Sequence, residues 1–179
     1  SSCRVEIINE GKEAARVTDI LAFRIKPNWS GDTSLYGEGF TMLSQTGGTM
    51  ANPVDIGQYT DRSHYRIPER PGYRSIYGLA LFHPIGSPYQ LLGFSSCRRY
   101  SGRFDVRTGE ICVSIDPEGM VLQPGERREL ETLVVIEDAN RSAALAKLGK
   151  AVSRNHPRLK FAAPPRGWSS WYCFGPGVT

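Results

Sequence analysis

The sequence predicts a mainly β protein built as an antiparallel β-sandwich. Nineteen glycines and twelve prolines among 179 residues imply many turns, which suit short strands better than helices. Turn signals recur roughly every 8–15 residues through the second half, a spacing typical of antiparallel sandwiches. Between the turns lie short runs of alternating apolar and polar residues, the pattern of strands buried on one face.

The N-terminal part contains two strand candidates. Cys3–Asn9 alternates, with Val5 and Ile7 on one face. Arg16–Ile25 is a second apolar run, and its phase slips after Val17, which indicates a bulge. We expect these two runs to pair as a hairpin across the turn that separates them.

The segment Pro27–Arg70 is the least regular part, and short strands are expected inside it at Gly39–Ser44 and Tyr65–Ile67. Its glycine-rich loops carry several aromatic residues. Such aromatics can stack on sugar rings, and Trp29 is the candidate for this role. The alternative is that they plug the edges and ends of the sandwich.

The second half contains a regular series of strand candidates with turns between them. Arg107, Thr108 and Gly109 form a hairpin turn in which the glycine supplies a positive φ. The expected strands are Arg74–His83, Gln90–Cys97, Ser101–Val106, Glu110–Ile115, Met120–Leu122 and Glu129–Glu137.

A helix follows the strands. The composition changes after Asp138, and Ser142–Arg154 is rich in alanine, leucine and lysine. Asp138 or Asn140 is placed to cap its first turn with a side-chain oxygen. The apolar stripe of this helix is expected to consist of Leu145, Leu148 and Val152.

Charge and hydropathy exclude some partners. The net charge is +4, but the basic residues are scattered and form no stripe for nucleic acid. No apolar run of about 18 residues is present, so no membrane partner is expected. The start, Ser1–Val5, has neither an initiator methionine nor a signal-peptide pattern, and reads as a cut inside a longer chain. Localisation cannot be read from it.

The cysteines and histidines predict no metal site. Cys3, Cys97, Cys112 and Cys173 contain no CxxC pair, and the three histidines lack ligand spacing. Cys97 and Cys112 lie on neighbouring strand candidates and can face each other. The alternative is that they are buried, unpaired thiols that pack as small hydrophobic side chains.

An aromatic run closes the chain. Gly167-Trp168-Ser169-Ser170-Trp171-Tyr172 lies between the breakers Pro164-Pro165 and Gly175-Pro176-Gly177, and its composition predicts a strand. This run resembles the opening barrel strand of clan D glycoside hydrolases, and most closely the α-galactosidase-like enzymes of family 36. In that family a Gly-Trp-x-Ser-Trp signature, often followed by Tyr, begins a (β/α)₈ barrel after a large N-terminal β-sandwich.

The resemblance implies a division of the chain. Residues 1–138 would be the sandwich, incomplete at its N-terminus; residues 139–165 a linker helix and Pro-rich linker; and residues 166–179 the first strand of a truncated barrel. The parent would hydrolyse terminal α-galactosides with retention and without metal or organic cofactor. The missing barrel would be the partner of the sandwich, which could also support homo-oligomer contacts.

The resemblance assigns binding residues and no catalytic residue. The family's catalytic aspartates lie on later barrel strands, so this chain alone is expected to be inactive. Trp171 matches the second tryptophan of the signature and would wall the sugar subsite, with Tyr172 as a weaker candidate beside it. The alternative for Trp171 is packing in the barrel core. A second class of function stays open, a free-standing carbohydrate-binding or structural β-sandwich without activity.

Overall fold

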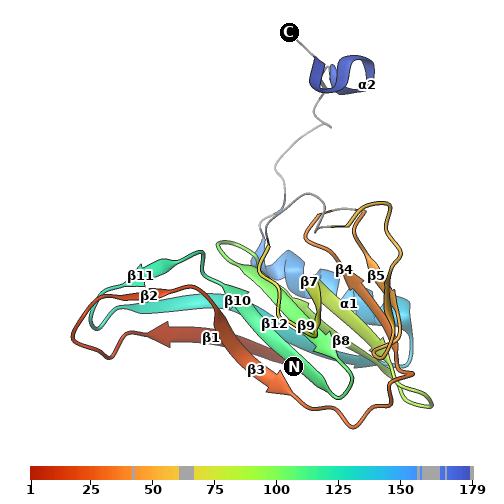
Figure 1. Ribbon diagram of the computed structural model, residues 1–179, viewed down its shortest axis with the longest axis horizontal. Helices are drawn as coiled ribbons and strands as arrows, with labels where there is room; N and C mark the ends of the chain where they lie inside the picture. Colours follow the sequence, from red (N-terminus) through yellow and green to blue (C-terminus); the bar gives the residue numbers. More distant parts are fainter. Residues whose placement is uncertain (42, 61–66, 157, 159–165, 168, 178–179) are drawn as a thin grey trace.

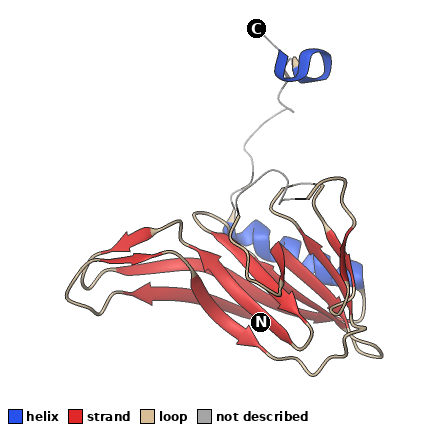
Figure 2. Cartoon of the chain, in the orientation of Figure 1, coloured by secondary structure: helices blue, strands red, loops and turns tan. Residues whose placement is uncertain are grey.

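The structure is a computed structural model that describes residues 1–41, 43–60, 67–156, 158, 166–167 and 169–177. As predicted, these residues are mainly antiparallel strands with one long helix near the C-terminus (Figures 1 and 2). The strands are β1 Ser2–Ile8, β2 Ala15–Val17, β3 Ile20–Ile25, β4 Ser34–Glu38, β5 Thr46–Gly48, β6 Pro53–Asp55, β7 Arg74–His83, β8 Tyr89–Phe94, β9 Ser101–Arg107, β10 Glu110–Asp116, β11 Met120–Leu122 and β12 Arg127–Asp138. The helices are α1 Arg141–Asn155, α2 Trp171–Phe174 and the 3₁₀ turn η2 Gly175–Gly177.

Strand β7 is the point at which the sheet divides. Its first part, Arg74–Tyr77, pairs with β9, and its second part, Leu79–Phe82, pairs with β8. Gly78 lies between the two parts with a φ of 71°, a backbone conformation that favours glycine. From β7 the sheet continues through β8 and β12 to β1 in one direction, and through β9 and β10 to β3 in the other.

The two halves of the sheet enclose the main core. This arrangement is nearly barrel-like, because one large hydrogen-bonded sheet curves around the main apolar cluster, while β2 and β11 form a separate two-stranded sheet. Strands of both halves fill the cluster with buried side chains, among them Phe82, Leu92, Phe94, Phe104, Val113 and Leu133.

Helix α1 covers the outer face of β8 and β12 and forms a second apolar cluster there. Ala144 and Leu148 of the helix pack with Leu91 and Val134. Gly93 lets the helix come close, since a Cβ at this position would lie 2.7 Å from a methyl carbon of Leu148. The predicted helix is confirmed, although Leu145 is exposed and Ala144 takes its expected place in the apolar stripe.

The predicted hairpin between the first two runs is wrong. β1 pairs with β12, while β2 pairs with β11 and β3 pairs with β10. The reason lies at Asn9, whose backbone exchanges hydrogen bonds with the distant turn at Gly125 and Glu126. Its side-chain amide also donates to the carbonyl oxygen of Leu122 at 2.9 Å. These contacts hold the end of β1 to the strands that follow residue 110.

Two smaller expectations concern the irregular segment. The strand expected at Gly39–Ser44 is wrong, because the strand there is β4, which ends at Glu38. Leu35 and Gly37 of β4 are buried at alternate positions, as in a strand with one covered face. The sequence analysis expected this strand further along the chain, after Glu38. The strand expected at Tyr65–Ile67 falls largely outside the described residues.

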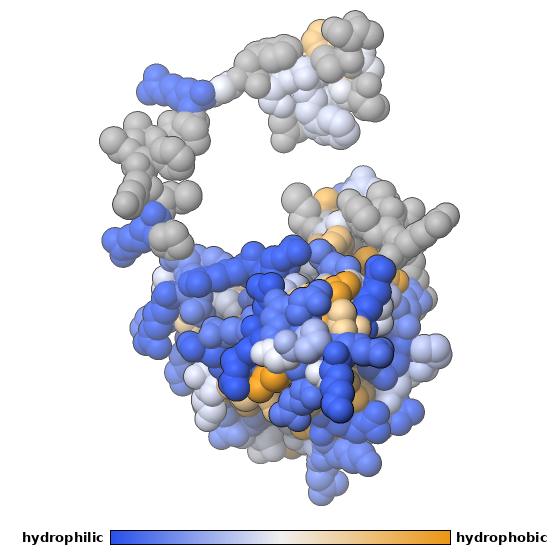
Figure 3. Space-filling view, turned by 90° about the vertical axis from the view of Figure 1, so that its left-hand side faces the viewer, coloured by the Kyte–Doolittle hydropathy of each residue, from blue (hydrophilic) through white to orange (hydrophobic). Residues whose placement is uncertain are grey.

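The C-terminal run is not a strand in this structure. Trp171–Phe174 forms one helical turn, in which the Phe174 N–H donates to the Ser170 carbonyl at 2.8 Å. A single strand leaves its backbone groups unpaired, whereas a helical turn satisfies some of them locally. α2 therefore replaces the predicted strand, and it stands clear of the sheet (Figures 1 and 3).

Candidate functional site

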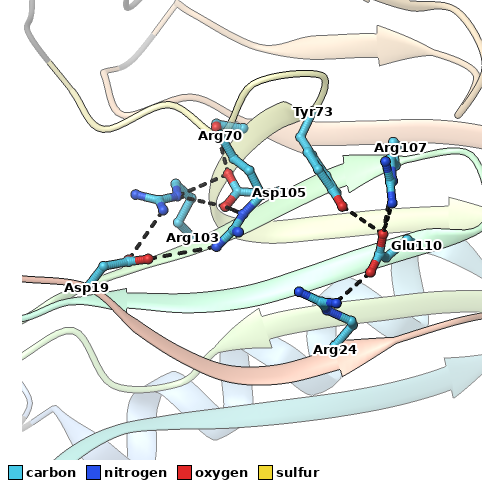
Figure 4. A network of polar contacts seen from close by, with 9 residues as sticks. Asp19, Arg24, Arg70, Tyr73, Arg103, Asp105, Arg107 and Glu110 are labelled. Atoms are coloured by element: carbon cyan, nitrogen blue, oxygen red, sulfur yellow. Dashed lines mark hydrogen bonds and ion pairs between the residues drawn. The ribbon is translucent and has the colours of Figure 1, made fainter.

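The outer face of β9 carries charged side chains (Figure 4), although β9 and the neighbouring strand β10 are largely buried. Phe104 and Val106 lie in the core, so Arg103, Asp105 and Arg107 point the other way, because side chains alternate along a strand. Neighbouring strands and segments bring further polar side chains to this face: Asp19, Arg24, Arg70, Tyr73, Ser75 and Glu110.

Asp105 is the centre of the first cluster, and it is fully buried. Arg103 Nε donates to both of its carboxylate oxygens, at 3.0 and 3.1 Å. Arg70 Nε donates to Oδ2 at 3.1 Å, and Ser75 Oγ donates to Oδ1 at 2.7 Å. Asp19 lies at the edge of the cluster, 3.4 Å from Arg103 and 3.7 Å from Arg70.

The cluster shifts the pKa of both arginines upward. For Arg70 the main cause is its hydrogen bond to Asp105. For Arg103, burial lowers the pKa, but the charge and hydrogen bond of Asp105 outweigh that effect. Both guanidinium groups therefore stay charged, and their charges compensate a carboxylate that has no contact with water.

Glu110 is the centre of the second cluster. The Tyr73 hydroxyl donates to Glu110 Oε2 at 2.6 Å, and Arg107 Nε donates to the same oxygen at 2.9 Å. Arg24 Nε lies 3.1 Å from the other oxygen. The hydrogen bond from Tyr73, followed by that from Arg107, lowers the pKa of Glu110 below its usual range. The Arg107 guanidinium also lies 4.6 Å from the centre of the Tyr73 ring.

This network suits a structural role better than catalysis. Glycoside hydrolysis needs two carboxyl groups on either side of an open site, one of them able to donate a proton. Asp105 and Glu110 instead use their oxygens to accept bonds from arginine, serine and tyrosine donors. The contacts of Arg70 and Tyr73 fasten the segment before β7 onto the sheet.

A small polar pocket lies beside the network. Its volume is about 110 Å³, which is below the range of about 300–1,000 Å³ that ligand sites occupy. Arg74 crosses it, donating from Nε to Thr46 Oγ1 at 2.8 Å and forming an ion pair with Asp55. The pocket is thus large enough for water molecules but too small for a sugar ring.

An apolar groove lies between α1 and the dividing point of the sheet. Its volume is about 410 Å³. Leu148 and Val152 of the helix line it together with Phe40 and Leu79. Cys97 lines the groove and is exposed. Partial burial, which is the larger effect, and the negative charge of Glu131 both raise the pKa of the Cys97 thiol.

The structure does not bring the predicted sugar-binding residues together. Trp29 packs against Phe82, with ring centres 5.2 Å apart, at the border of the core. The sugar-stacking role of Trp29 therefore stays a prediction. Trp171 belongs to α2 and is 64% exposed, and Tyr172 follows it in the same turn. Their binding role stays a prediction.

Sequence reasoning missed the charged network, although a signal was present. Arg103, Asp105 and Arg107 alternate with apolar residues in a run that also predicts a buried strand. Charged residues at every second position place these side chains together on one face of the strand, and the opposite signs at Arg103 and Asp105 allow them to pair there. The cysteine alternatives are settled for this structure: Cys97 is exposed, Cys112 is buried, and both are unpaired.

No family model matches the chain, and no curated protein matches it significantly. Within the described residues, no helix has the length and apolarity needed to cross a membrane. In that same part of the chain, no three His, Cys, Asp or Glu side chains gather in a way that could hold a metal ion.

Proposed function

We propose that this chain is the non-catalytic N-terminal part of a retaining glycoside hydrolase that resembles α-galactosidases. In this proposal residues 1–138 form the β-sandwich domain, α1 leads into the linker, and residues 166–179 become the first strand of the catalytic barrel. The complete enzyme would hydrolyse terminal α-galactosides, and the chain by itself would be inactive.

The exposed aromatic turn α2 is the observation that carries the proposal. Trp171 and Phe174 are 64% and 58% exposed, and they follow a body that already encloses its own apolar clusters. Large apolar side chains without cover mark surfaces that another part of a protein buries. A barrel that begins with this segment would provide that cover and would convert the isolated turn into a paired strand.

The proposal is tested first on the native polypeptide. Its intact mass and its sequence beyond Thr179 are expected to show several hundred further residues with aspartates at the ends of later strands. The native protein should release p-nitrophenol from p-nitrophenyl α-galactoside with retention of configuration, and residues 1–179 alone should not. A native chain ending at Thr179, or a longer one without activity on α-glycosides, would overturn the proposal.

The second candidate is a free-standing carbohydrate-binding module, and the exposure of Trp171 also favours it. The flat indole face can stack on the apolar face of a galactose ring. Titration calorimetry of residues 1–179 with galactose and raffinose tests this function. Binding that disappears in Trp171→Ala and persists in Ile85→Ala, a variant at another exposed apolar side chain, would favour the module.

A further inference from the structure

A second polar pocket lies on the outer face of the sheet, where β4, β7 and β8 meet the start of α1. Its volume is about 240 Å³, the space of about eight water molecules. This is more than twice the volume of the pocket that Arg74 crosses. The pocket can therefore admit one small ligand of about the size of a monosaccharide.

The register of the strands turns polar side chains into this pocket. Leu35 and Phe82 point into the main core. The residues beside them, Ser34 and His83, therefore point outward. Ser34 lies directly opposite His83 in the β4–β7 ladder, so the two side chains share one face. Tyr89 of β8 stacks on His83, with ring centres 4.0 Å apart and planes 12° from parallel.

Packing holds the rings of the pocket in place. Tyr36 and Tyr89 pack against the second apolar cluster, and Leu81 of that cluster lines the pocket. Both tyrosines and His83 are half-buried. Rings that are fixed before a ligand arrives lose little conformational freedom when it binds.

The polar groups of the pocket are not used by the fold. Four of its side chains take part in no side-chain hydrogen bond or ion pair within the described residues: Ser34, His83, Tyr89 and Arg141. The pocket beside the charged network differs, because its arginine is already paired. A few polar groups that converge on one preformed pocket are what fixes the orientation of a small ligand.

Arg141 gives the pocket a positive charge. Asp138, three positions earlier, is engaged in an ion pair of its own. Glu38 does not line the pocket, and its oxygens accept hydrogen bonds from Tyr36 and Gln45. Burial and Glu38 raise the pKa of Tyr36 to about 12, and the charge of Arg141 acts in the opposite direction, which places the guanidinium near this phenol.

We propose that this pocket, which we call the Arg141 pocket, binds a small carboxylate that also carries hydroxyl groups, as an acidic monosaccharide does. The fork of the Arg141 guanidinium matches the two oxygens of a carboxylate. The Ser34 and Tyr89 hydroxyls and the His83 imidazole can each donate to or accept from the hydroxyl groups of the ligand. A simple anion would use the arginine and leave these groups on the strands unused.

This inference goes beyond the proposed function and does not depend on it. The Arg141 pocket is built from β4, β7, β8 and α1, and it uses neither the aromatic turn α2 nor a catalytic barrel. Trp171→Ala, the change that would abolish binding by a free-standing module, should therefore leave binding in the Arg141 pocket unchanged. A loss of binding in Trp171→Ala would place the ligand at α2 and would overturn the proposal.

Titration calorimetry of residues 1–179 with sodium D-galacturonate tests the binding, with D-galactose and inorganic phosphate as controls. We expect galacturonate to bind with a Kd of about 1 mM or below. Galactose lacks the carboxylate and phosphate lacks the ring hydroxyls, so each should bind at least about tenfold more weakly. The proposal would be overturned if galacturonate did not bind, or if either control bound as tightly as galacturonate.

Matched variants locate the binding. Arg141→Gln removes the charge and is expected to weaken galacturonate binding by at least about tenfold. Tyr89→Phe keeps the ring and removes the hydroxyl, and should weaken it by about threefold to tenfold. Lys150→Gln removes an exposed cation elsewhere on α1 and should leave the affinity unchanged. Circular dichroism confirms that the variants are folded. Equal affinity of Arg141→Gln and Lys150→Gln would show that the ligand does not use this pocket.

Discussion

Arg103 and Asp105 stand two residues apart on β9 and form an ion pair on its outer face, in which Arg103 Nε is shared between both carboxylate oxygens; their side chains are 4% and 0% exposed. An ion pair at this depth needs further donors and acceptors, because each charge has lost its water. Arg70 and Ser75 supply donors to Asp105, and Asp19 accepts from Arg103. The pair therefore joins two separate parts of the chain, the region around the start of β7 and the segment before β3, to one strand.

The first prediction concerns the centre of this cluster. Asp105→Asn is expected to destabilise the fold by about 3–5 kcal/mol, because Arg103 and Arg70 keep their charges and lose their buried counter-charge, with only Asp19 at the edge of the cluster left to pair with them. Urea unfolding followed by circular dichroism measures the change. Asp32→Asn is the control, since Asp32 is exposed and its replacement should change the free energy of unfolding by less than about 0.5 kcal/mol. A loss for Asp105→Asn no larger than for Asp32→Asn would contradict the structural role.

The second prediction concerns the pH dependence of stability. The folded pKa of Glu110 lies below its usual range, because Tyr73 and Arg107 donate to its carboxylate. The unfolded chain, with a glutamate pKa of about 4.3, binds the proton first as the pH falls. The stabilisation by Glu110 is therefore complete above about pH 4.3 and is lost as the pH falls through the lower folded pKa.

Replacement of this carboxylate should reduce that acid sensitivity. We expect Glu110→Gln to lose less unfolding free energy than the wild type between pH 7 and pH 3, as measured by urea titration at each pH. Glu13→Gln, at an exposed glutamate, is the matched control and should follow the wild type. If Glu110→Gln and Glu13→Gln gave the same pH profile, the low pKa of Glu110 would be refuted.

The third prediction concerns the contact between α1 and β8. A valine at Gly93 would place its Cβ within 2.7 Å of a Leu148 methyl carbon. Gly93→Val is therefore expected to cost about 1–3 kcal/mol by overpacking. Combining it with Leu148→Ala should give a smaller loss than the sum of the two single changes, because the shorter side chain makes room. Additive losses in thermal unfolding would show that the two residues do not touch.

Gly149 of α1 is a position at which a larger side chain is expected to stabilise the protein. A Cβ there would meet no atom within 4 Å, so the space is open. Gly149→Ala is expected to stabilise the protein by about 0.5–1 kcal/mol, because alanine loses less backbone entropy in a helix. A rise in melting temperature checks this. A fall would mean that α1 at this position is not helical or not exposed.

The sequence predicts the local structure of this protein better than it predicts which strands pair with each other. The hairpin of β9 and β10 is correct because Gly109 has the positive φ, 73°, that its turn requires. The hairpin of the first two runs is wrong because Asn9 forms its decisive bonds with Leu122, Gly125 and Glu126. Those partners are more than a hundred positions away, and no local pattern reveals them.

In the charged network on β9, too, the sequence predicts the local arrangement but not the long-range contacts. Alternation along β9 indicates that Arg103 and Asp105 share a face, but only the fold brings Arg70 and Asp19 to them. The exposed aromatic turn was identified from composition, whereas its conformation depends on whether a neighbouring strand exists. A strand needs a partner that these residues cannot supply, so composition alone predicted the wrong element.

The fifth prediction concerns the start of α1. Asn140 has an extended backbone, and its Oδ1 accepts a hydrogen bond from the Ala143 N–H at 3.0 Å. This bond satisfies one of the amide groups that the first helical turn leaves unpaired. Asn140→Ala is therefore expected to reduce the free energy of unfolding by about 1 kcal/mol, and Asn140→Ser to keep most of it. Chemical denaturation of both variants measures the effect. Equal losses for alanine and serine would show that the side-chain oxygen does not cap the helix, and the stability of α1 would then come from its packing on β8 and β12.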